Sequence, residues 1–178
     1  MVLIEETTLY FAYGSNMNLH QMKYRCPDAQ VVGNVHLEGC RLAFRGNGSG
    51  CGVATILPES GSRVEGVMWR VSGQDEQILD CYEGYPRLYG KETIRVQDRQ
   101  GRSYEVMVYT MQPPYKECLA MPSPSYLRGI LEGCQQNGLA VRPVLEAVQR
   151  TQMEQTVPKQ YQQESLFKPP RRKSNPER

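Results

Sequence analysis

Seven short segments of the sequence are rich in β-branched, aromatic and other apolar residues, and turn-forming residues separate them. They are residues 9–14, 30–39, 40–46, 52–57, 63–71, 88–97 and 102–111. The last two are joined by the sequence DRQG, which is typical of a hairpin turn. Because the strands follow one another with few helices between them, we expect an α+β fold. Its antiparallel or mixed sheet would curl into a small barrel, in contrast to a doubly wound parallel sheet.

Helical periodicity is found in fewer segments. They are a short stretch after Asn16 that ends before Pro27, residues 73–82, a stretch that begins near Pro124, and Val141 to Val148. Ser72 and Asp75 have the spacing of a capping box and mark the start of the second helix, and Gly84 marks its end. We expect these few helices at the periphery of the sheet.

The composition changes at Thr151, where Gln, Pro and charged residues become frequent and aliphatic residues rare. Such a segment buries too little apolar surface to offset the entropy lost on ordering. We therefore divide the chain into a folded domain, residues 1–150, and a disordered basic tail, residues 151–178. The cluster KPPRRK in this tail could contact nucleic acid or another protein, but a solvated basic segment is the favoured interpretation.

Charge and cysteine content argue against several classes of protein. The net charge of +2 favours neither a nucleic-acid partner nor an acidic membrane surface. No signal-peptide pattern and no run of eighteen apolar residues is present, so we expect a soluble, cytoplasmic protein. The six cysteines include no C-x-x-C pair, there are only two histidines, and no acidic cluster has calcium or magnesium spacing. The sequence therefore predicts no metal site.

One predicted strand ends in an unusual way, in the segment LYFAYGSNMN at residues 9–18. Its apolar half is followed by Gly14, Ser15 and Asn16, three residues that favour turns and offer hydrogen-bond donors. Ser15 does not lie in a G-x-S-x-G elbow, and with two histidines in the chain a serine triad is not favoured. The glycine-rich stretch RGNGSGCG, residues 45–52, lacks the P-loop ending and is predicted to be a loop between strands.

Two further residues are candidates for a site. Glu83 lies in the last turn of its predicted helix, where the helix dipole disfavours an anion, and Tyr85 and Tyr89 follow it. A solvated helix-end glutamate is the simpler alternative. Tyr126 lies in the first turn of the helix that begins near Pro124, where it would either point into a cavity or belong to the core.

Taken together, these segments resemble the γ-glutamylcyclotransferase family over residues 8–140. The motifs LYFAYGSN, GVATI, VEGVMW, LDCYEG and PSPSY occur in that order, with YGSN in place of the YGT typical of γ-glutamylamine cyclotransferases. The resemblance implies a small mixed fold centred on a curled barrel, with a cavity at one end. It also implies that residues 1–150 form a catalytic domain.

The same resemblance assigns roles to individual residues. It implies that Glu83 carries protons during catalysis. It also implies a substrate-binding set formed by Tyr10, Phe11, Ala12, Tyr13, Gly14, Ser15, Asn16 and Tyr126. Tyr89 joins this set only if a small gap is placed after Glu83.

The implied reaction is an intramolecular acyl transfer that releases 5-oxoproline from a small γ-glutamyl peptide or amine, with no metal or cofactor. The donors of residues 14–16 would bind either the substrate's α-carboxylate or the oxygen of the attacked carbonyl. Three alternatives remain open: a γ-glutamylamine cyclotransferase, an enzyme that removes a γ-glutamyl protecting group in biosynthesis, and a non-catalytic binding module with a basic tail. The oligomeric state is also open, with a homo-oligomer among the options.

Overall fold

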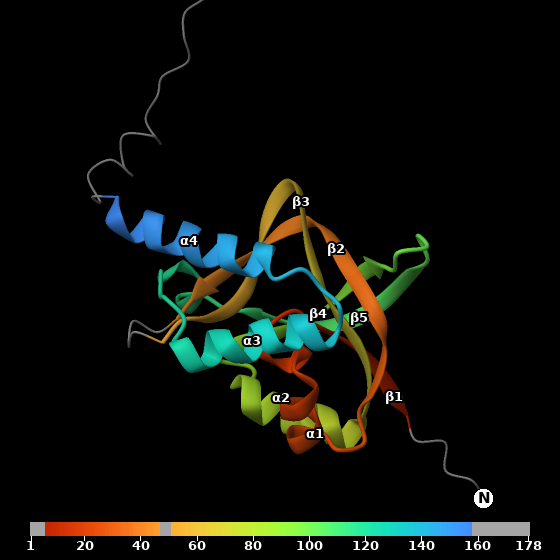
Figure 1. Ribbon diagram of the computed structural model, residues 1–178. Helices are drawn as coiled ribbons and strands as arrows, with labels where there is room; N and C mark the ends of the chain where they lie inside the picture. Colours follow the sequence, from red (N-terminus) through yellow and green to blue (C-terminus); the bar gives the residue numbers. More distant parts are fainter. Residues whose placement is uncertain (1–5, 47–50, 158–178) are drawn as a thin grey trace, which may run out of the picture.

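A computed structural model describes residues 6–46 and 51–157 (Figure 1). Within these ranges, five strands form a closed barrel in the order β1-β3-β2-β4-β5. The strands are β1 (Thr7–Ala12), β2 (Gln30–Arg45), β3 (Val53–Ser72), β4 (Tyr89–Gln97) and β5 (Ser103–Met111). Neighbouring strands are antiparallel, except that β1 and β5 are parallel and close the barrel. The predicted α+β fold with a small barrel is confirmed.

Four of the predicted strands are in fact two long ones. β2 contains 30–39 and 40–45, and β3 contains 53–57 and 63–71, so the prediction of seven short strands was wrong. Gly39 was taken as the end of a strand, but its positive φ of 76° belongs to a β-bulge between Glu38 and Cys40. A bulge bends a strand without ending it, which helps so few strands to close a barrel.

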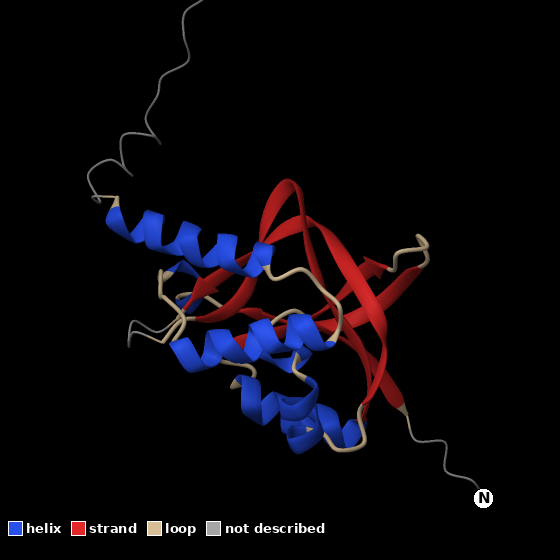
Figure 2. Ribbon diagram, viewed as in Figure 1, coloured by secondary structure: helices blue, strands red, loops and turns tan. Residues whose placement is uncertain are grey.

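The helices gather on one side of the barrel, as the blue ribbons of Figure 2 show. They are η1 (Ser15–Met17), α1 (Leu19–Arg25), α2 (Gly73–Glu83), η2 (Tyr115–Glu117), α3 (Pro124–Gln136) and α4 (Arg142–Thr156). The predicted capping box of α2 is present, with reciprocal hydrogen bonds between Ser72 and Asp75. Gly84 ends α2 in the left-handed conformation, at φ 63°. These two ends fix Glu83 as the last residue of the helix.

Close contact between β1 and β3 places the end of β1 deep in the molecule. A Cβ atom on Gly66 would lie 2.3 Å from the carbonyl oxygen of Ala12, so only a glycine allows the two strands to approach as they do. Phe11 and Val67 are fully buried beside this contact. The polar turn that follows β1 therefore starts from a fixed position in the core.

Helix α4 extends beyond the predicted start of the tail at Thr151. Thr151 is buried, and Glu154 forms ion pairs with Arg41 and Arg45 of β2. Residues 151–156 are therefore helical, because their polar side chains have partners on the barrel that composition does not reveal. Residues 158–178, the rest of the predicted tail, lie outside the described residues.

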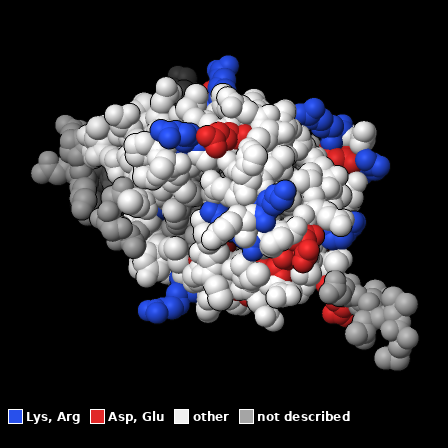
Figure 3. All heavy atoms as spheres, turned by 60° about the horizontal axis from the view of Figure 1, so that its bottom comes forward, with Lys and Arg blue, Asp and Glu red and all other residues white. Residues whose placement is uncertain are grey.

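The described residues contain no helix that is both long and apolar enough to cross a membrane. On the face shown in Figure 3, the basic and acidic side chains are interspersed with uncharged surface. No broad area of one sign is visible there, so this face does not have the basic footprint typical of a nucleic-acid-binding surface.

Candidate active site

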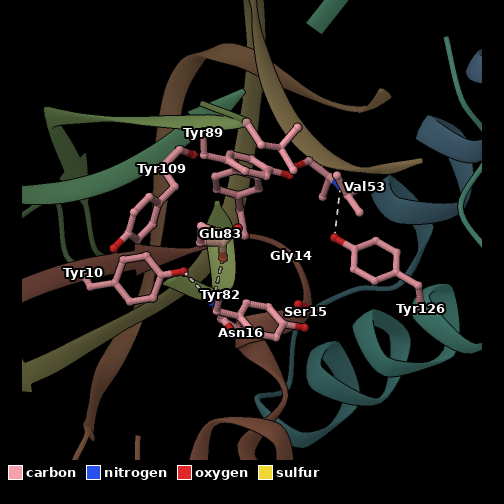
Figure 4. A pocket seen from close by; sticks show the side chains of 13 residues that line it. Tyr10, Gly14, Ser15, Asn16, Val53, Tyr82, Glu83, Tyr89, Tyr109 and Tyr126 are labelled. Carbon is pink, nitrogen blue, oxygen red and sulfur yellow. Dashed lines mark hydrogen bonds between the residues drawn. The ribbon is translucent and has the colours of Figure 1, made fainter. Parts of the chain in front are cut away.

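A pocket of about 190 Å³ lies at one end of the barrel (Figure 4). Strands β1 and β5 end at this pocket, and β3 and β4 begin there. The lining residues, six of them tyrosines, are Tyr10, Tyr13, Gly14, Ser15, Asn16, Val53, Ala54, Tyr82, Glu83, Leu88, Tyr89, Tyr109 and Tyr126. One carboxyl group thus lies in a small pocket of aromatic rings and hydroxyl groups.

Glu83 is the acid of this pocket. Its side chain accepts a hydrogen bond from the Asn16 amide, with 3.1 Å between Nδ2 and Oε1. Burial raises the pKa of Glu83 from 4.5 to about 7, against the opposing effects of the Arg25 charge and the Asn16 hydrogen bond. Near neutral pH the carboxyl group is therefore present in both protonated and ionised forms, as a group that both accepts and donates protons must be.

Asn16 is held by four contacts in the turn after β1. Its Nδ2 atom also donates to the Tyr10 hydroxyl over 3.0 Å, as Figure 4 shows. Its backbone carbonyl accepts from the indole N–H of Trp69 over 3.0 Å, and Arg25 donates to its Oδ1 over 2.5 Å. Both ends of the side chain are thus fixed, and the amide group faces Glu83.

Backbone N–H groups of the same turn are available to a ligand. In the part of the chain that the structure describes, the backbone hydrogen bonds of the turns and loops include none that is donated by the N–H of Gly14, Ser15 or Asn16. The carbonyls of Gly14 and Ser15 are occupied, since they accept from Met17 and Asn18. Consecutive free N–H groups in a turn form a concavity suited to an anion.

Two tyrosine hydroxyls donate hydrogen bonds to backbone carbonyls around the pocket. Tyr13 donates to the carbonyl of Tyr109 over 2.6 Å, and Tyr89 donates to the carbonyl of Ala54 over 2.5 Å. The Tyr109 hydroxyl donates to Asp80 on α2 over 2.6 Å. These hydroxyl hydrogens shape the pocket but are not free to reach a substrate.

In contrast to Tyr13, Tyr89 and Tyr109, the hydroxyl oxygens of Tyr10 and Tyr126 act as acceptors, as does that of the more exposed Tyr82, which accepts from Arg25. The Tyr10 oxygen accepts from Asn16, and the Tyr126 oxygen accepts from the backbone N–H of Ala54 over 3.0 Å. Each therefore keeps a hydroxyl hydrogen that can donate into the pocket. Burial raises the pKa of both tyrosines above the ordinary value, so both remain neutral donors at physiological pH.

The structure brings most of the predicted site residues together. Glu83 and Tyr126 line the pocket with Tyr10, Tyr13, Gly14, Ser15 and Asn16. Phe11 and Ala12 do not line it: their side chains are fully buried in the core, and both residues pair with β3. Tyr89, whose assignment required a gap, lies in the pocket.

Several lining residues have no signal in the sequence. Tyr109, Val53 and Leu88 reach the pocket only because the barrel closes, and each reads as an ordinary strand or loop residue. Arg25 touches the turn from outside the pocket, and its place near the end of a short predicted helix gave no reason to single it out. These residues reach the site through tertiary contacts, which local sequence patterns do not predict.

Comparison with known proteins gives consistent matches. The family described as "Gamma-glutamyl cyclotransferase, AIG2-like" matches residues 10–128, a range that includes the whole pocket. Gamma-glutamylcyclotransferase of Mus musculus is 36% identical over 142 residues, which cover 75% of this chain and 73% of the mouse protein. The Homo sapiens protein of that name is 34% identical over 143 residues, covering 76% and 74%. A solved structure named "Gamma-glutamyl cyclotransferase" is 30% identical, with a TM-score of 0.70, and covers 83% of this chain and 87% of that one.

Proposed function

The chain belongs to the gamma-glutamyl cyclotransferase, AIG2-like family of enzymes, and from this premise we propose that it releases 5-oxoproline from small γ-glutamyl compounds. The observation that carries the proposal is the placement of Glu83. A carboxyl group with a pKa of about 7 faces a turn with free backbone N–H groups and two tyrosines with free hydroxyl hydrogens.

The reaction needs no nucleophile from the protein. In a γ-glutamyl amide, the α-amino nitrogen can reach the γ-carbonyl carbon and close a five-membered ring. A new C–N bond forms, the C–N bond to the departing amine breaks, and 5-oxoproline remains. The task of the pocket is to hold the glutamyl chain in its ring-closing conformation, which removes rotational freedom before the reaction.

Glu83 is proposed to carry the proton. The substrate's α-amino group is an ammonium ion at neutral pH, with an ordinary pKa of about 8, so it must lose a proton before it attacks. The ionised Glu83 carboxylate accepts that proton and then delivers it to the leaving nitrogen. After the attack the ring nitrogen still carries one excess proton, which passes by the same route, so the amine departs as an ammonium ion and Glu83 is ionised again. A pKa of about 7 is close enough to that of the ammonium group for both transfers.

Two negative centres of the substrate require donors. One is the α-carboxylate, and the other is the carbonyl oxygen, which gains charge during the attack. The pocket offers two sets of donors, the backbone N–H groups of residues 14–16 and the hydroxyl groups of Tyr10 and Tyr126. Both centres can therefore be bound at the same time.

The test is direct incubation of the full chain with a γ-glutamyl dipeptide and detection of 5-oxoproline by mass spectrometry. Glu83→Gln should nearly abolish turnover, because the amide cannot accept the proton. Glu92→Gln, which changes an exposed glutamate on β4, is the matched control and should retain activity. A Glu83→Gln variant with full activity would remove the proposed role of this residue.

Specificity for the leaving group is measured with a substrate panel of γ-glutamyl dipeptides, γ-glutamylamines and ε-lysine conjugates. The small pocket volume favours a compact substrate over a large one. Turnover of amines alone would indicate a γ-glutamylamine cyclotransferase, and turnover of protected biosynthetic intermediates alone would indicate a deprotecting enzyme. Absence of product across the whole panel would leave the non-catalytic binding module as the better description.

Cellular location and assembly are separate predictions. We propose a cytoplasmic protein, which fractionation of cells that produce the full chain would test. Size-exclusion chromatography with light scattering would decide between a monomer and a homo-oligomer.

A further inference from the structure

Arg25, the last residue of α1, lies against the turn after β1 without lining the pocket. Its Nη1 donates to Asn16 Oδ1 over 2.5 Å and to Ser15 Oγ over 3.3 Å. Its Nη2 donates to Gln21 Oε1 over 2.8 Å and to the Tyr82 hydroxyl, and its guanidinium carbon lies 3.7 Å from the centroid of the Tyr82 ring. The terminal N–H groups are thus all engaged, so Arg25 is held in place and is not a free cation for a substrate carboxylate.

An asparagine side chain has two orientations that exchange its oxygen and nitrogen. A guanidinium group can only donate, so the Asn16 atom that faces Arg25 must be the oxygen. The NH2 group is then directed to the other side, where Glu83 Oε1 lies at 3.1 Å and the Tyr10 oxygen at 3.0 Å. In the reversed orientation, two donors would face each other at Arg25 and two oxygens would face each other at Glu83.

We propose that Arg25 is a positioning residue for Glu83, which acts by holding Asn16 in the orientation that donates to the Glu83 carboxylate and by placing a positive charge nearby. The inference rests on the proposed role of Glu83 as the proton carrier. In this arrangement Arg25 touches neither the substrate nor the reacting atoms. It keeps the ionised form of a buried acid accessible near neutral pH.

Among the titratable side chains of the described residues that face Glu83, Arg25 is the cation that can stabilise its ionised form. The titratable side chains that face Glu83 from the packed elements are Tyr10, Tyr13, Arg25, Tyr82, Tyr89, Tyr109 and Tyr126. A tyrosine side chain carries no positive charge, whereas an arginine guanidinium is a cation. Burial favours the protonated acid, and both influences that oppose it, the Arg25 charge and the Asn16 hydrogen bond, depend on Arg25 in this geometry.

The test measures the pKa of Glu83 by NMR in full-length protein that carries ¹³C at the glutamate side-chain carboxyl carbons. The signal that is absent from Glu83→Gln identifies Glu83. We expect Arg25→Met to raise the pKa by about one unit or more, and Arg25→Lys, which restores the charge, to recover part of that change. Lys23→Met removes a positive charge from the exposed side of the same helix and should leave the pKa unchanged. Arg25→Gln gives the same measurement if the methionine variant does not fold.

A second measurement tests whether the effect passes through Asn16. Asn16→Ala should raise the Glu83 pKa by itself, and adding Arg25→Met should then raise it by less than Arg25→Met does in the unmodified protein. If the two substitutions raised the Glu83 pKa by fully additive amounts, Arg25 would act only through its charge, and its role in positioning Asn16 would be overturned.

Activity supplies the third readout. If the pKa rises from about 7 to about 8, the ionised fraction at pH 7 falls about fivefold, and kcat/KM should fall by the same factor and recover at higher pH. An unchanged Glu83 pKa in Arg25→Met and Arg25→Gln would overturn the inference whether or not the protein is a cyclotransferase. A raised pKa in a protein that forms no 5-oxoproline would uphold the inference and refute the proposed function.

Discussion

The amide nitrogen of Asn16 lies 3.1 Å from the carboxyl oxygen Oε1 of Glu83, although the two residues are 67 positions apart in the sequence. Asn16 belongs to the turn after β1, and Glu83 is the last residue of α2. Their hydrogen bond joins the donor-rich turn to the acid of the pocket. It also opposes the burial that would otherwise keep the acid protonated, so the chemistry of Glu83 depends on the geometry of this turn.

Glu83 should lower the stability of the folded protein as the pH rises. Its pKa is about 7 in the folded protein and near 4.5 when exposed, so between these values the folded state keeps a proton that the unfolded state releases. The free energy of unfolding therefore falls as the pH rises through this window, by about 3 kcal/mol in total. Glutamine does not titrate, so Glu83→Gln should be more stable than the wild type at pH 8 and nearly equal to it near pH 4.

Urea denaturation at both pH values, followed by circular dichroism, measures this difference. Glu92→Gln serves as the control, since an exposed carboxylate contributes little to the pH dependence. If the stability difference between wild type and Glu83→Gln were the same at pH 4 and pH 8, the raised pKa would be contradicted.

The hydroxyls of Tyr126 and Tyr89 should have different effects on catalysis, although both bond to Ala54. Tyr126 accepts from the Ala54 N–H and keeps its own hydrogen free, whereas Tyr89 donates its hydrogen to the Ala54 carbonyl. Tyr126→Phe and Tyr89→Phe should each cost about 1 kcal/mol of stability, because each leaves one backbone group of Ala54 without its partner. In contrast, Tyr126→Phe should lower kcat/KM about tenfold or more, since it also removes a donor for the substrate, and Tyr89→Phe should lower it far less.

Steady-state kinetics with a γ-glutamyl dipeptide, together with thermal melting of both variants, separates the two effects. If Tyr126→Phe and Tyr89→Phe lost the same stability and also the same kcat/KM, the free hydroxyl of Tyr126 would have no catalytic function.

Local chemistry made much of this fold predictable from the sequence. The capping box at Ser72 and Asp75 and the terminating Gly84 gave the ends of α2 almost to the residue, because hydrogen bonds between near neighbours set both ends. The turn after β1 and Glu83 could be singled out because each conflicts with its local context: a core strand that ends in donors, and an anion at the wrong end of a helix dipole.

Features that depend on closure of the barrel could not be predicted in this way. Gly39 and Gly61 both have positive φ, and each resembles the end of a strand in the sequence. In the structure Gly39 lies at a bulge within β2, and Gly61 lies within β3, so both long strands continue past these glycines. Phe11 was assigned with its neighbours from a contiguous motif, although its side chain is fully buried in the core while that of Tyr10 lines the pocket. Arg25 acts through contacts with Asn16 and Tyr82 that only the folded chain creates.

Gly14 should be needed for the shape of the pocket. A Cβ atom at this position would lie 3.1 Å from the Cβ of Ala54 and 3.5 Å from the Tyr126 hydroxyl oxygen. Its φ of −122° lies outside the left-handed region that favours glycine, so we expect Gly14→Ala to fold but to narrow the site. We expect KM to rise about tenfold with a stability loss of about 1 kcal/mol, because the shift needed to relieve the contact falls on pocket residues.

Gly73→Ala is the matched control, since no atom lies within 4 Å of a Cβ at that exposed position in the first turn of α2. It should leave KM unchanged. A Gly14→Ala variant with wild-type KM would mean that the substrate does not approach this part of the turn.

The folded unit should extend to the end of α4, and not stop at residue 150. Glu154 pairs with Arg45 over 3.2 Å, and Arg45 is 6% exposed, so removal of Glu154 would leave a nearly buried cation without its carboxylate partner. Loss of such a partner costs about 3 kcal/mol. Truncation after Arg150 should therefore destabilise the domain by at least that amount, and Glu154→Gln should reproduce most of the loss. Truncation after Val157 should leave both stability and cyclotransferase activity unchanged.

Glu146→Gln provides the matched control on the same helix. Its partner Arg142 has an 85% exposed side chain, so breaking this pair should cost less than about 0.5 kcal/mol. Guanidinium denaturation of the two truncated proteins and the two point variants measures all four effects on one scale. If truncation after Arg150 were as stable as truncation after Val157, the ion pairs of α4 would contribute nothing, and the domain would end where the composition changes.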